Sequence, residues 1–291
     1  MFSLPEEERD VRTSSKRMGI KLHNKLIDDM QAFPQKVRVL NYCGFGEPLL
    51  EPELPEMISY AVKKNVAYIT EVITNGLLLT PEMSNKLADS GLTRLKISVQ
   101  GLNSATYEKF SGVKVDYDKI VNNVRYFYEH RKNVKLFVKT MEEELEGRPE
   151  QEFFDVFGDI CDDISIEHLN PAYKKIDFTG LLNGEANVTM LGNEIPNHRV
   201  CHRPFIAMSI HSDGKVDPCC FSEIPGIIGD INNESIVDIW NGKKANRLRY
   251  IQLTDKNKNE VCGSCRQYQY TATKEDNLDN ISQKIIDKFK V

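Results

Sequence analysis

Residues 36–50 read K-V-R-V-L-N-Y-C-G-F-G-E-P-L-L. The first half is rich in β-branched and apolar residues, and the second half is rich in glycine, so this stretch predicts a buried strand that ends in a loop. Gly44 and Gly46 let the backbone approach a small molecule closely. Glu47 adds a carboxylate at the carboxyl end of the strand, where α/β folds bind their ligands. An ordinary turn between a strand and a helix would have the same composition, so both interpretations stay open here.

Size and charge exclude several classes of protein. The chain has 291 residues, enough for one large α/β domain and a small appendage. Its net charge is -5, with 38 Lys and Arg against 43 Asp and Glu, so it offers no basic field for nucleic acid or anionic lipid. No apolar run approaches the ~18 residues that a membrane span needs, and the first residues do not follow the order of a signal peptide. We therefore expect a cytoplasmic protein.

Strands and helices alternate along the first 171 residues. After the opening strand, we expect strands over 68–74, 94–99, 134–140 and 164–169, and helices over 20–33, 53–64, 80–91, 104–110, 117–130 and 150–160. This alternation predicts a parallel sheet in a barrel or half-barrel. Each of the five strands ends in polar or small residues, and these are expected to share one edge of the sheet: Gly44 to Glu47, Thr74 and Asn75, Ser98 to Gln100, Lys139 and Thr140, and Asn170 and Pro171. No strand precedes the first helix, although a repeating βα fold normally begins with one.

The pattern changes after Pro171. Residues 172–200 are rich in glycine and asparagine and predict a linker. Residues 201–270 contain a predicted hairpin, short helices and a cluster of cysteines, which indicates a second, small module. Residues 271–291 predict an exposed amphipathic helical tail.

Five of the seven cysteines lie between Cys201 and Cys265, which favours metal ligation over disulfides in a reducing compartment. Cys262 and Cys265 form a C-x-x-C turn, and Cys201 and Cys219 can supply a second pair of thiolates. Four thiolates suit zinc or an iron-sulfur cluster, and the ligand count does not separate the two. Cys220 is the expected spare, because its side chain would point away from that of Cys219 in an extended segment.

The other candidate ligands have simpler interpretations. Cys43 and Cys161 stand alone and are expected to be small buried hydrophobes. His198 and His202 could replace a thiolate in a zinc site, but we expect them to be surface histidines.

Taken together, the motifs resemble those of radical S-adenosylmethionine (radical SAM) enzymes that carry a C-terminal SPASM or twitch module. The likeness rests on G-F-G-E-P-L-L at 44–50, I-T-N-G-L-L-L at 73–79, K-I-S-V-Q-G at 96–101, D-G-K-V-D-P-C at 213–219 and C-G-S-C at 262–265. It covers nearly the whole chain. It implies a partial (β/α)6 TIM-like barrel that lacks its first strand, over residues 1–171, followed by the cysteine-rich module.

The sequence departs from this family at one place. The C-x-x-x-C-x-x-C motif that holds the family's catalytic cluster is absent, and no cysteine precedes Cys43. We hypothesise that the chain begins just after that motif, because Gly46, Glu47, Ser98 and Gln100 look retained for cofactor binding. The alternative is a paralogue that has lost the loop. In either case we expect the chain as given to be inactive, with a catalytic four-iron four-sulfur cluster only if the missing segment is restored.

The resemblance implies a reaction and a set of site residues. Members cleave S-adenosylmethionine to a 5′-deoxyadenosyl radical, which oxidises a substrate by hydrogen abstraction. The implied cofactor contacts are Gly44, Gly46 and Glu47 to the amino group, Ser98 and Gln100 to the ribose or carboxylate, and Asn170 beside the adenine. An auxiliary four-iron four-sulfur cluster on Cys201, Cys219, Cys262 and Cys265 would accept an electron. The substrate would be a small molecule or a peptide, the electron donor a flavodoxin or ferredoxin, and no residue is assigned as catalytic.

Two other functions stay open. The four cysteines could hold zinc or a cluster for structure alone, in a scaffold without catalysis. The chain could also be an electron carrier whose barrel no longer catalyses a reaction.

Overall fold

The computed structural model describes residues 17–44, 46–171, 188–219 and 224–290. The chain divides into two compact units, residues 1–167 and residues 168–291. The predicted linker falls largely on residues 172–187, and these lie outside the described residues, as does Cys220.

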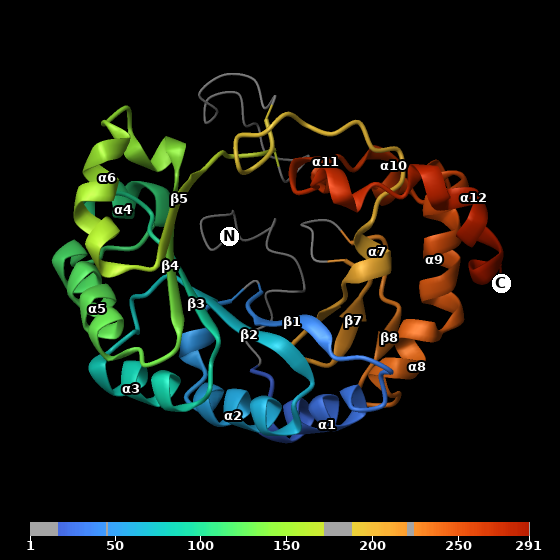
Figure 1. Ribbon diagram of the computed structural model, residues 1–291, viewed down its shortest axis with the longest axis horizontal. Helices are drawn as coiled ribbons and strands as arrows, with labels where there is room; N and C mark the ends of the chain where they lie inside the picture. The colour runs from blue at the N-terminus through green and yellow to red at the C-terminus, as the bar shows by residue number, and fades with distance from the viewer. Residues whose placement is uncertain (1–16, 45, 172–187, 220–223, 291) are drawn as a thin grey trace. The chain divides into compact units, whose positions relative to one another are not determined.

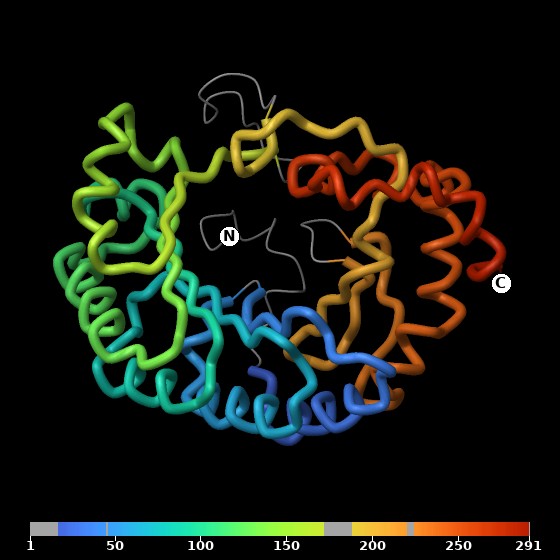
Figure 2. The backbone as a smooth tube through the Cα atoms, viewed as in Figure 1, coloured from blue at the N-terminus to red at the C-terminus, as the bar shows by residue number. Residues whose placement is uncertain are grey.

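The first unit is built on one sheet of five parallel strands in the order β1-β2-β3-β4-β5. The strands are β1 (Val37–Tyr42), β2 (Ala67–Thr74), β3 (Arg94–Ser98), β4 (Lys135–Met141) and β5 (Asp163–Glu167). Between them run α2 (Leu54–Lys64), α3 (Pro81–Asp89), α4 (Ser104–Ser111), α5 (Tyr117–His130) and α6 (Glu150–Phe157), and α1 (Ile20–Met30) comes before β1. Figure 2 follows the chain from each strand through a helix to the next. The predicted alternation is therefore confirmed.

Local sequence explains where the helices begin. Thr80, Asn103 and Asp116 accept hydrogen bonds from the first-turn backbone of α3, α4 and α5, as N-cap residues do. Pro81 stands at the first position of α3, where its fixed φ suits a helix and its missing N–H costs nothing.

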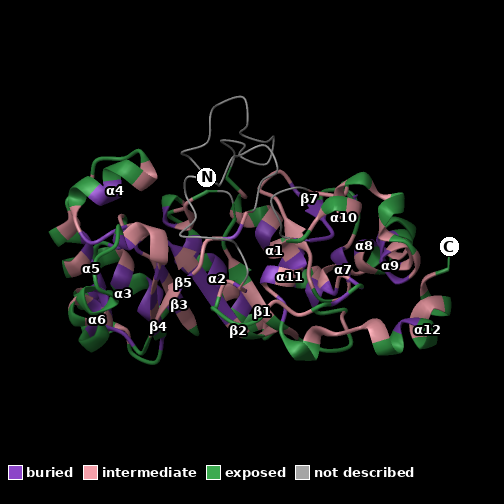
Figure 3. Cartoon of the chain, turned by 90° about the horizontal axis from the view of Figure 1, so that it is seen from above, coloured by how far each residue is buried: buried purple, intermediate pink, exposed green. Residues whose placement is uncertain are grey.

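The helices pack on one face of the sheet, as Figure 1 shows for the described part of this unit. Their apolar sides meet alternate strand residues in one core, which includes Val72, Leu95, Ile97, Leu136 and Val138. Buried residues accordingly concentrate on the strands and on the sheet-facing sides of the helices (Figure 3). The intervening strand residues point to the opposite face, which we call the inner face.

The second unit has less regular structure. Its three-stranded antiparallel sheet consists of β6 (Ser209–Ile210), β7 (Lys215–Asp217) and β8 (Gly229–Asp230). Its helices are α7 (Arg203–Ile206), α8 (Ile236–Asn241), α9 (Lys243–Thr254), α10 (Glu260–Ser264), α11 (Gln267–Tyr270) and α12 (Ser282–Ile285). Within the described residues, the short 3-10 segments are η3 (Pro48–Leu50), η4 (Glu142–Leu145), η5 (Gly158–Ile160), η6 (Lys256–Lys258), η7 (Lys274–Asp276), η8 (Asp279–Ile281) and η9 (Ile286–Phe289).

Two expectations need correction. Cys161 is buried as predicted, but Cys43 is exposed because it lies just beyond the end of β1. The C-terminal tail is helical in short turns, yet it is not simply exposed. Asp279 accepts hydrogen bonds from the backbone of Arg199 and Val200, and Phe289 packs edge-on against Phe205. No helix within the described ranges combines the length and apolar character needed to cross a lipid bilayer.

Replacing Gly101 with alanine should destabilise the loop that follows β3. Gly101 has φ +129°, and a Cβ there would lie 2.4 Å from Thr106 Cγ2. We expect Gly101→Ala to lower the free energy of unfolding by about 2 kcal/mol or more, because strain and a clash add together. Urea unfolding measures this.

The matched control is Gly158→Ala. Gly158 has helical angles, φ -57° and ψ -39°, and no heavy atom within 4 Å of an added Cβ. We expect it to leave stability within about 0.5 kcal/mol of wild type or to raise it slightly. Equal losses in both variants would contradict the account of Gly101.

Candidate functional site

Glu47 joins the loop after β1 to the end of β2. Its Oε1 accepts hydrogen bonds from Leu49 N at 3.0 Å and Thr74 Oγ1 at 2.5 Å, and its Oε2 accepts one from Asn75 N at 3.0 Å. An ionised carboxylate has about four acceptor positions, so these three bonds leave about one for a ligand. Glu47 therefore fixes the loop at the carboxyl edge of the sheet, a role that the sequence alone did not indicate.

The glycines of this loop are open to their surroundings. Gly44 and Gly46 are exposed, and a Cβ at either position would meet no heavy atom within 4 Å. Gly44 has φ +157°, which favours glycine. The loop thus presents bare backbone beside the Glu47 carboxylate.

Ser98 and Gln100 lie at the end of β3, on the same edge of the sheet. Ser98 pairs in register with Lys139 of β4, and it points to the inner face. Both residues are half-buried, and the Ser98 hydroxyl has no hydrogen-bond partner among the described residues. The structure therefore brings Glu47, Ser98 and Gln100 to one edge of a single sheet, as predicted from the strand ends.

Asn170 belongs to the other unit. It is buried, and its Nδ2 donates to the backbone oxygen of Val188 at 3.3 Å. Its Oδ1 is buried without a hydrogen-bond partner among the described residues. Asn170 follows the end of β5 by three residues along the chain.

Glu144 is a residue of the edge that the sequence analysis missed. It lies in η4, directly after β4, and its Oε2 accepts from Met141 N at 2.9 Å and Thr140 Oγ1 at 3.1 Å. Burial raises the pKa of Glu144 to about 7, against the lowering effect of these bonds. The signal in the sequence was a run of three glutamates placed just after a strand.

Four cysteines are neighbours in the second unit. Cys219 forms a small apolar core with Tyr268, and Cys201 and Cys265 pack against it. Burial, and after it the nearby Cys219, Cys265 and Cys262, raise the pKa of Cys201 to about 12. Burial likewise raises the pKa of Cys262 to about 11. Cys219 is buried and the other three cysteines are partly buried. Thiols this close together cannot all ionise without a cation among them, and a metal group that binds them as thiolates would supply that cation.

The surroundings of these cysteines refine the prediction. Cys265 N donates to Cys262 O at 3.3 Å, which closes the C-x-x-C turn. Among the described residues, no three His, Cys, Asp or Glu side chains are arranged to hold a metal ion as they stand. Cys201, Cys219 and Cys265 nevertheless pack together, and the C-x-x-C turn keeps Cys262 beside Cys265. We therefore describe the four as a thiol cluster and not as a preformed metal site.

The two histidines beside the cluster are not surface residues, contrary to expectation. His198 and His202 are both buried, and burial lowers the pKa of His202 to about 4. The backbone oxygen of His198 accepts a hydrogen bond from the buried Tyr268 hydroxyl at 2.8 Å.

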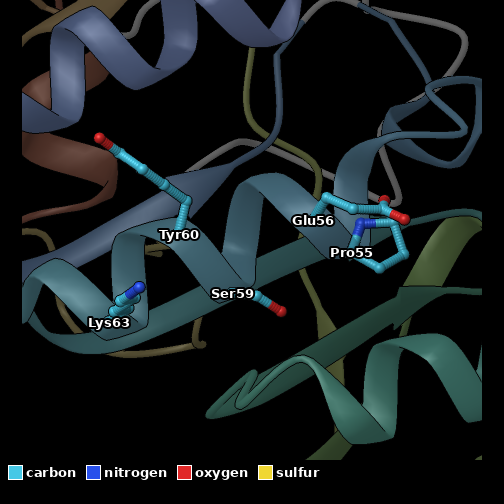
Figure 4. Close-up of a pocket in the computed structure, with 5 residues that line it drawn as sticks. All are labelled: Pro55, Glu56, Ser59, Tyr60 and Lys63. Carbon is cyan, nitrogen blue, oxygen red and sulfur yellow. The ribbon is translucent and has the colours of Figure 1, made fainter.

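A shallow depression of about 350 Å³ lies on α2, lined by Pro55, Glu56, Ser59, Tyr60 and Lys63 (Figure 4). Its lining belongs to the helix layer and contains none of the predicted site residues. We therefore do not regard it as the functional site.

Comparison with known protein families finds two matches. Residues 15–151 match the radical SAM superfamily, and residues 201–266 match SPASM, an iron-sulfur cluster-binding domain. The resemblance drawn from the motifs is thus confirmed. The two matches contain every predicted site residue except Asn170.

Individual relatives are distant. The chain is 24% identical to an AdoMet-dependent heme synthase of Methanosarcina barkeri, over 85% of this chain and 82% of that protein. It is 24% identical to a PqqA peptide cyclase of Granulibacter bethesdensis, over 71% of this chain and 61% of the relative. The solved structure of anSMEcpe with bound AdoMet has a TM-score of 0.58 at 16% identity and covers 94% of this chain and 87% of its own. This likeness confirms the predicted fold class, a partial TIM-like α/β fold with a SPASM module.

Glu144 should make stability depend on pH. A carboxyl whose pKa is raised by folding stabilises the folded state fully below its unfolded pKa, near 4.5, and loses that contribution as the pH rises through about 7. Glu144→Gln keeps an oxygen that can accept from Met141 N and Thr140 Oγ1 but never ionises. We expect it to match wild type at pH 5 and to be more stable by roughly 1–2 kcal/mol at pH 8. Urea unfolding across this range is the measurement.

Glu152→Gln is the control. Glu152 is exposed and pairs with Arg148 one helical turn away. Its difference from wild type should stay small and flat from pH 5 to pH 8. A flat profile for Glu144→Gln as well would contradict the burial of an ionising carboxyl.

Proposed function

Because this chain belongs to the radical SAM superfamily and carries a SPASM domain, we propose that it is an oxidoreductase that uses S-adenosylmethionine to oxidise a substrate by hydrogen abstraction. The observation that carries the proposal is the meeting of Glu47, Ser98 and Gln100 at one edge of the sheet in a chain whose second unit groups four thiols. Family members are enzymes, and the two domains imply S-adenosylmethionine and four-iron four-sulfur clusters as cofactors.

The chemistry that these cofactors supply is hydrogen-atom removal from a substrate through a 5′-deoxyadenosyl radical. The C-x-x-x-C-x-x-C motif of the catalytic cluster is not in this sequence, so we assign no residue to that cluster. We propose that Gly44 and Gly46 offer backbone groups to the methionine end of S-adenosylmethionine. Glu47 holds that loop in place through Thr74 and Asn75 and keeps about one acceptor position for an ammonium.

The other contacts follow the sheet edge. We propose that Ser98 and Gln100 bind the ribose or the carboxylate, because the Ser98 hydroxyl faces the inner side without a protein partner among the described residues. Asn170 is retained as a candidate contact to the adenine, supported by its buried Oδ1 that lacks a hydrogen bond among the described residues.

Cys201, Cys219, Cys262 and Cys265 would hold the auxiliary cluster. Four thiolate ligands leave no open iron for a substrate, so electron transfer is the role that this ligand set supports. Removing a hydrogen atom and then an electron is a two-electron oxidation. We propose a small molecule or a peptide as substrate, since the relatives include a heme synthase and a peptide cyclase, and a flavodoxin or ferredoxin as electron donor.

The thiol cluster gives the first test. Protein purified without oxygen should contain about four iron and four sulfide per chain in this site. Cys262→Ser should lose most of both, because one ligand in four is removed. Iron and sulfide assays with an absorption spectrum measure this.

Cys161→Ala is the matched control, because Cys161 belongs to the core of the first unit and not to the apolar core that contains Cys219. It should keep its iron and sulfide. Stoichiometric zinc without sulfide in the wild type would instead support the non-catalytic scaffold.

The sheet edge gives the second test. We expect Ser98→Ala to weaken S-adenosylmethionine binding about tenfold in calorimetric titration, the effect of one lost hydrogen bond at a half-buried site. Its unfolding free energy should be unchanged, because the hydroxyl has no partner among the described residues.

Glu47→Gln and Glu53→Gln complete this test. Glu47→Gln should lose both affinity and stability, because an amide NH2 at Oε2 would face the Asn75 N–H. Glu53 is exposed in the following segment, so its variant should bind as wild type does. Unaltered binding in Ser98→Ala and Glu47→Gln together would refute the proposed cofactor position.

A further inference from the structure

The inner face of the sheet carries a charged network that the proposed cofactor contacts do not use. Glu71 of β2 is buried, with 4% of its side chain exposed. Its Oε1 accepts from Asn41 Nδ2 at 2.9 Å, while its Oε2 accepts from Arg94 Nε and lies 3.3 Å from Lys96 Nζ. One carboxylate is therefore shared by two cations.

Register explains why these residues meet. Asn41 pairs with Glu71, and Glu71 pairs with Arg94, so three neighbouring strands bring one row of side chains to the same face. Lys96 lies two residues further along β3, in register with Ile73 on one side and Phe137 on the other. The next residue in that row is Asp163, which is separated from Lys96 by the whole of β4.

Lys96 is the surplus cation of this network. Its ammonium has three donors, and its only ionic partner among the described residues is a carboxylate oxygen that Arg94 already contacts. Its neighbours in the row are Ile73 and Phe137, and its Nζ lies over the Phe137 ring, 5.5 Å from the ring centroid. About a quarter of the Lys96 side chain is exposed, so the surplus charge can be reached from outside.

Lys139, near the carboxyl end of β4 on the same face, shows the contrast. Lys139 Nζ pairs with Glu167 at 2.6 Å, and that carboxylate has no second cation among the described residues. The ion pair of Lys139 and Glu167 has no net charge. The network around Glu71 contains two cations and one carboxylate, so it has one uncompensated positive charge. Such a charge held at a partly buried position attracts an anion.

We propose that Lys96 and Arg94 form a subsite for a carboxylate or phosphate group of the substrate. The assignment to the substrate rests on the proposed function. Lys96 lies two residues below Ser98 on the same face, about 6.6 Å along the strand. An anion held there would anchor the substrate next to the proposed position of S-adenosylmethionine, which hydrogen abstraction requires.

Two variants with opposite expected effects test the subsite. Inorganic phosphate and acetate are titrated into the full chain at constant ionic strength, and binding is read by calorimetry and by the shift in unfolding temperature. Lys96→Met should weaken binding at least tenfold, because the surplus charge is gone. Glu71→Gln should tighten it about tenfold, because both cations lose their counterion while Asn41 keeps an acceptor.

Lys86→Met is the matched control, since it removes one positive charge from an exposed helix pair with Glu82. It should bind as wild type does. A network that is only structural would give no anion binding in wild type, or losses of stability in Lys96→Met and Glu71→Gln without opposite changes in affinity, and either result overturns the proposal.

A comparison of two adenosine ligands identifies the source of the anion. S-adenosylmethionine has a carboxylate, and 5′-methylthioadenosine has none. Lys96→Met should bind both as wild type does. If Lys96→Met weakened the binding of S-adenosylmethionine but not of 5′-methylthioadenosine, the subsite would bind the carboxylate of the cofactor, and the assignment to the substrate would be wrong. Neither phosphate nor acetate titration requires a cluster, so this test can fail or succeed independently of the iron, sulfide and S-adenosylmethionine measurements.

Discussion

The parallel register of β1 to β5 is the constraint on which the first unit depends. Parallel pairing sets all five carboxyl ends at one edge, and the two-residue period sends alternate side chains to opposite faces. One face is apolar and takes the helices, so the other is left for polar and charged side chains. The site and the inner-face network are therefore two results of the same pairing.

At the carboxyl edge of the sheet, the polar side chains hold the loops in place as well as offering groups to a ligand. The loop after β1 has exposed glycines and few contacts of its own, and it is fixed because the Glu47 carboxylate accepts hydrogen bonds from Thr74 and Asn75. Below the edge, Glu71 gathers Asn41, Arg94 and Lys96 in the same way. Two carboxylates, the partly buried Glu47 and the buried Glu71, thus connect neighbouring strands, and the hydrogen-bonding positions left open around them can bind a ligand.

The second unit relies on a different source of order. Its strands have two or three residues each, and its helices are mostly short, so regular hydrogen bonding provides little of its stability. Cys219 and Tyr268 form a small core there, with Cys201 and Cys265 packed against it. A metal group bound by these thiols would cross-link segments that are far apart in sequence, which is how small modules with little core are commonly stabilised.

The amino-acid sequence was sufficient for the order of strands and helices in the first unit, for the edge that holds Glu47, Ser98 and Gln100, and for the four grouped cysteines. Each of these follows from local patterns, namely the period of apolar residues, the helix-capping residues, the glycine-rich loops and the C-x-x-C spacing. Only the tertiary structure could decide that Cys43 is exposed, that His198 and His202 are buried, that burial raises the pKa of Glu144 and that Glu71 is shared by Arg94 and Lys96. Partners can be distant along the chain, as Asn41 is from Glu71 and Tyr268 is from His198, and no local pattern records which strands will be neighbours.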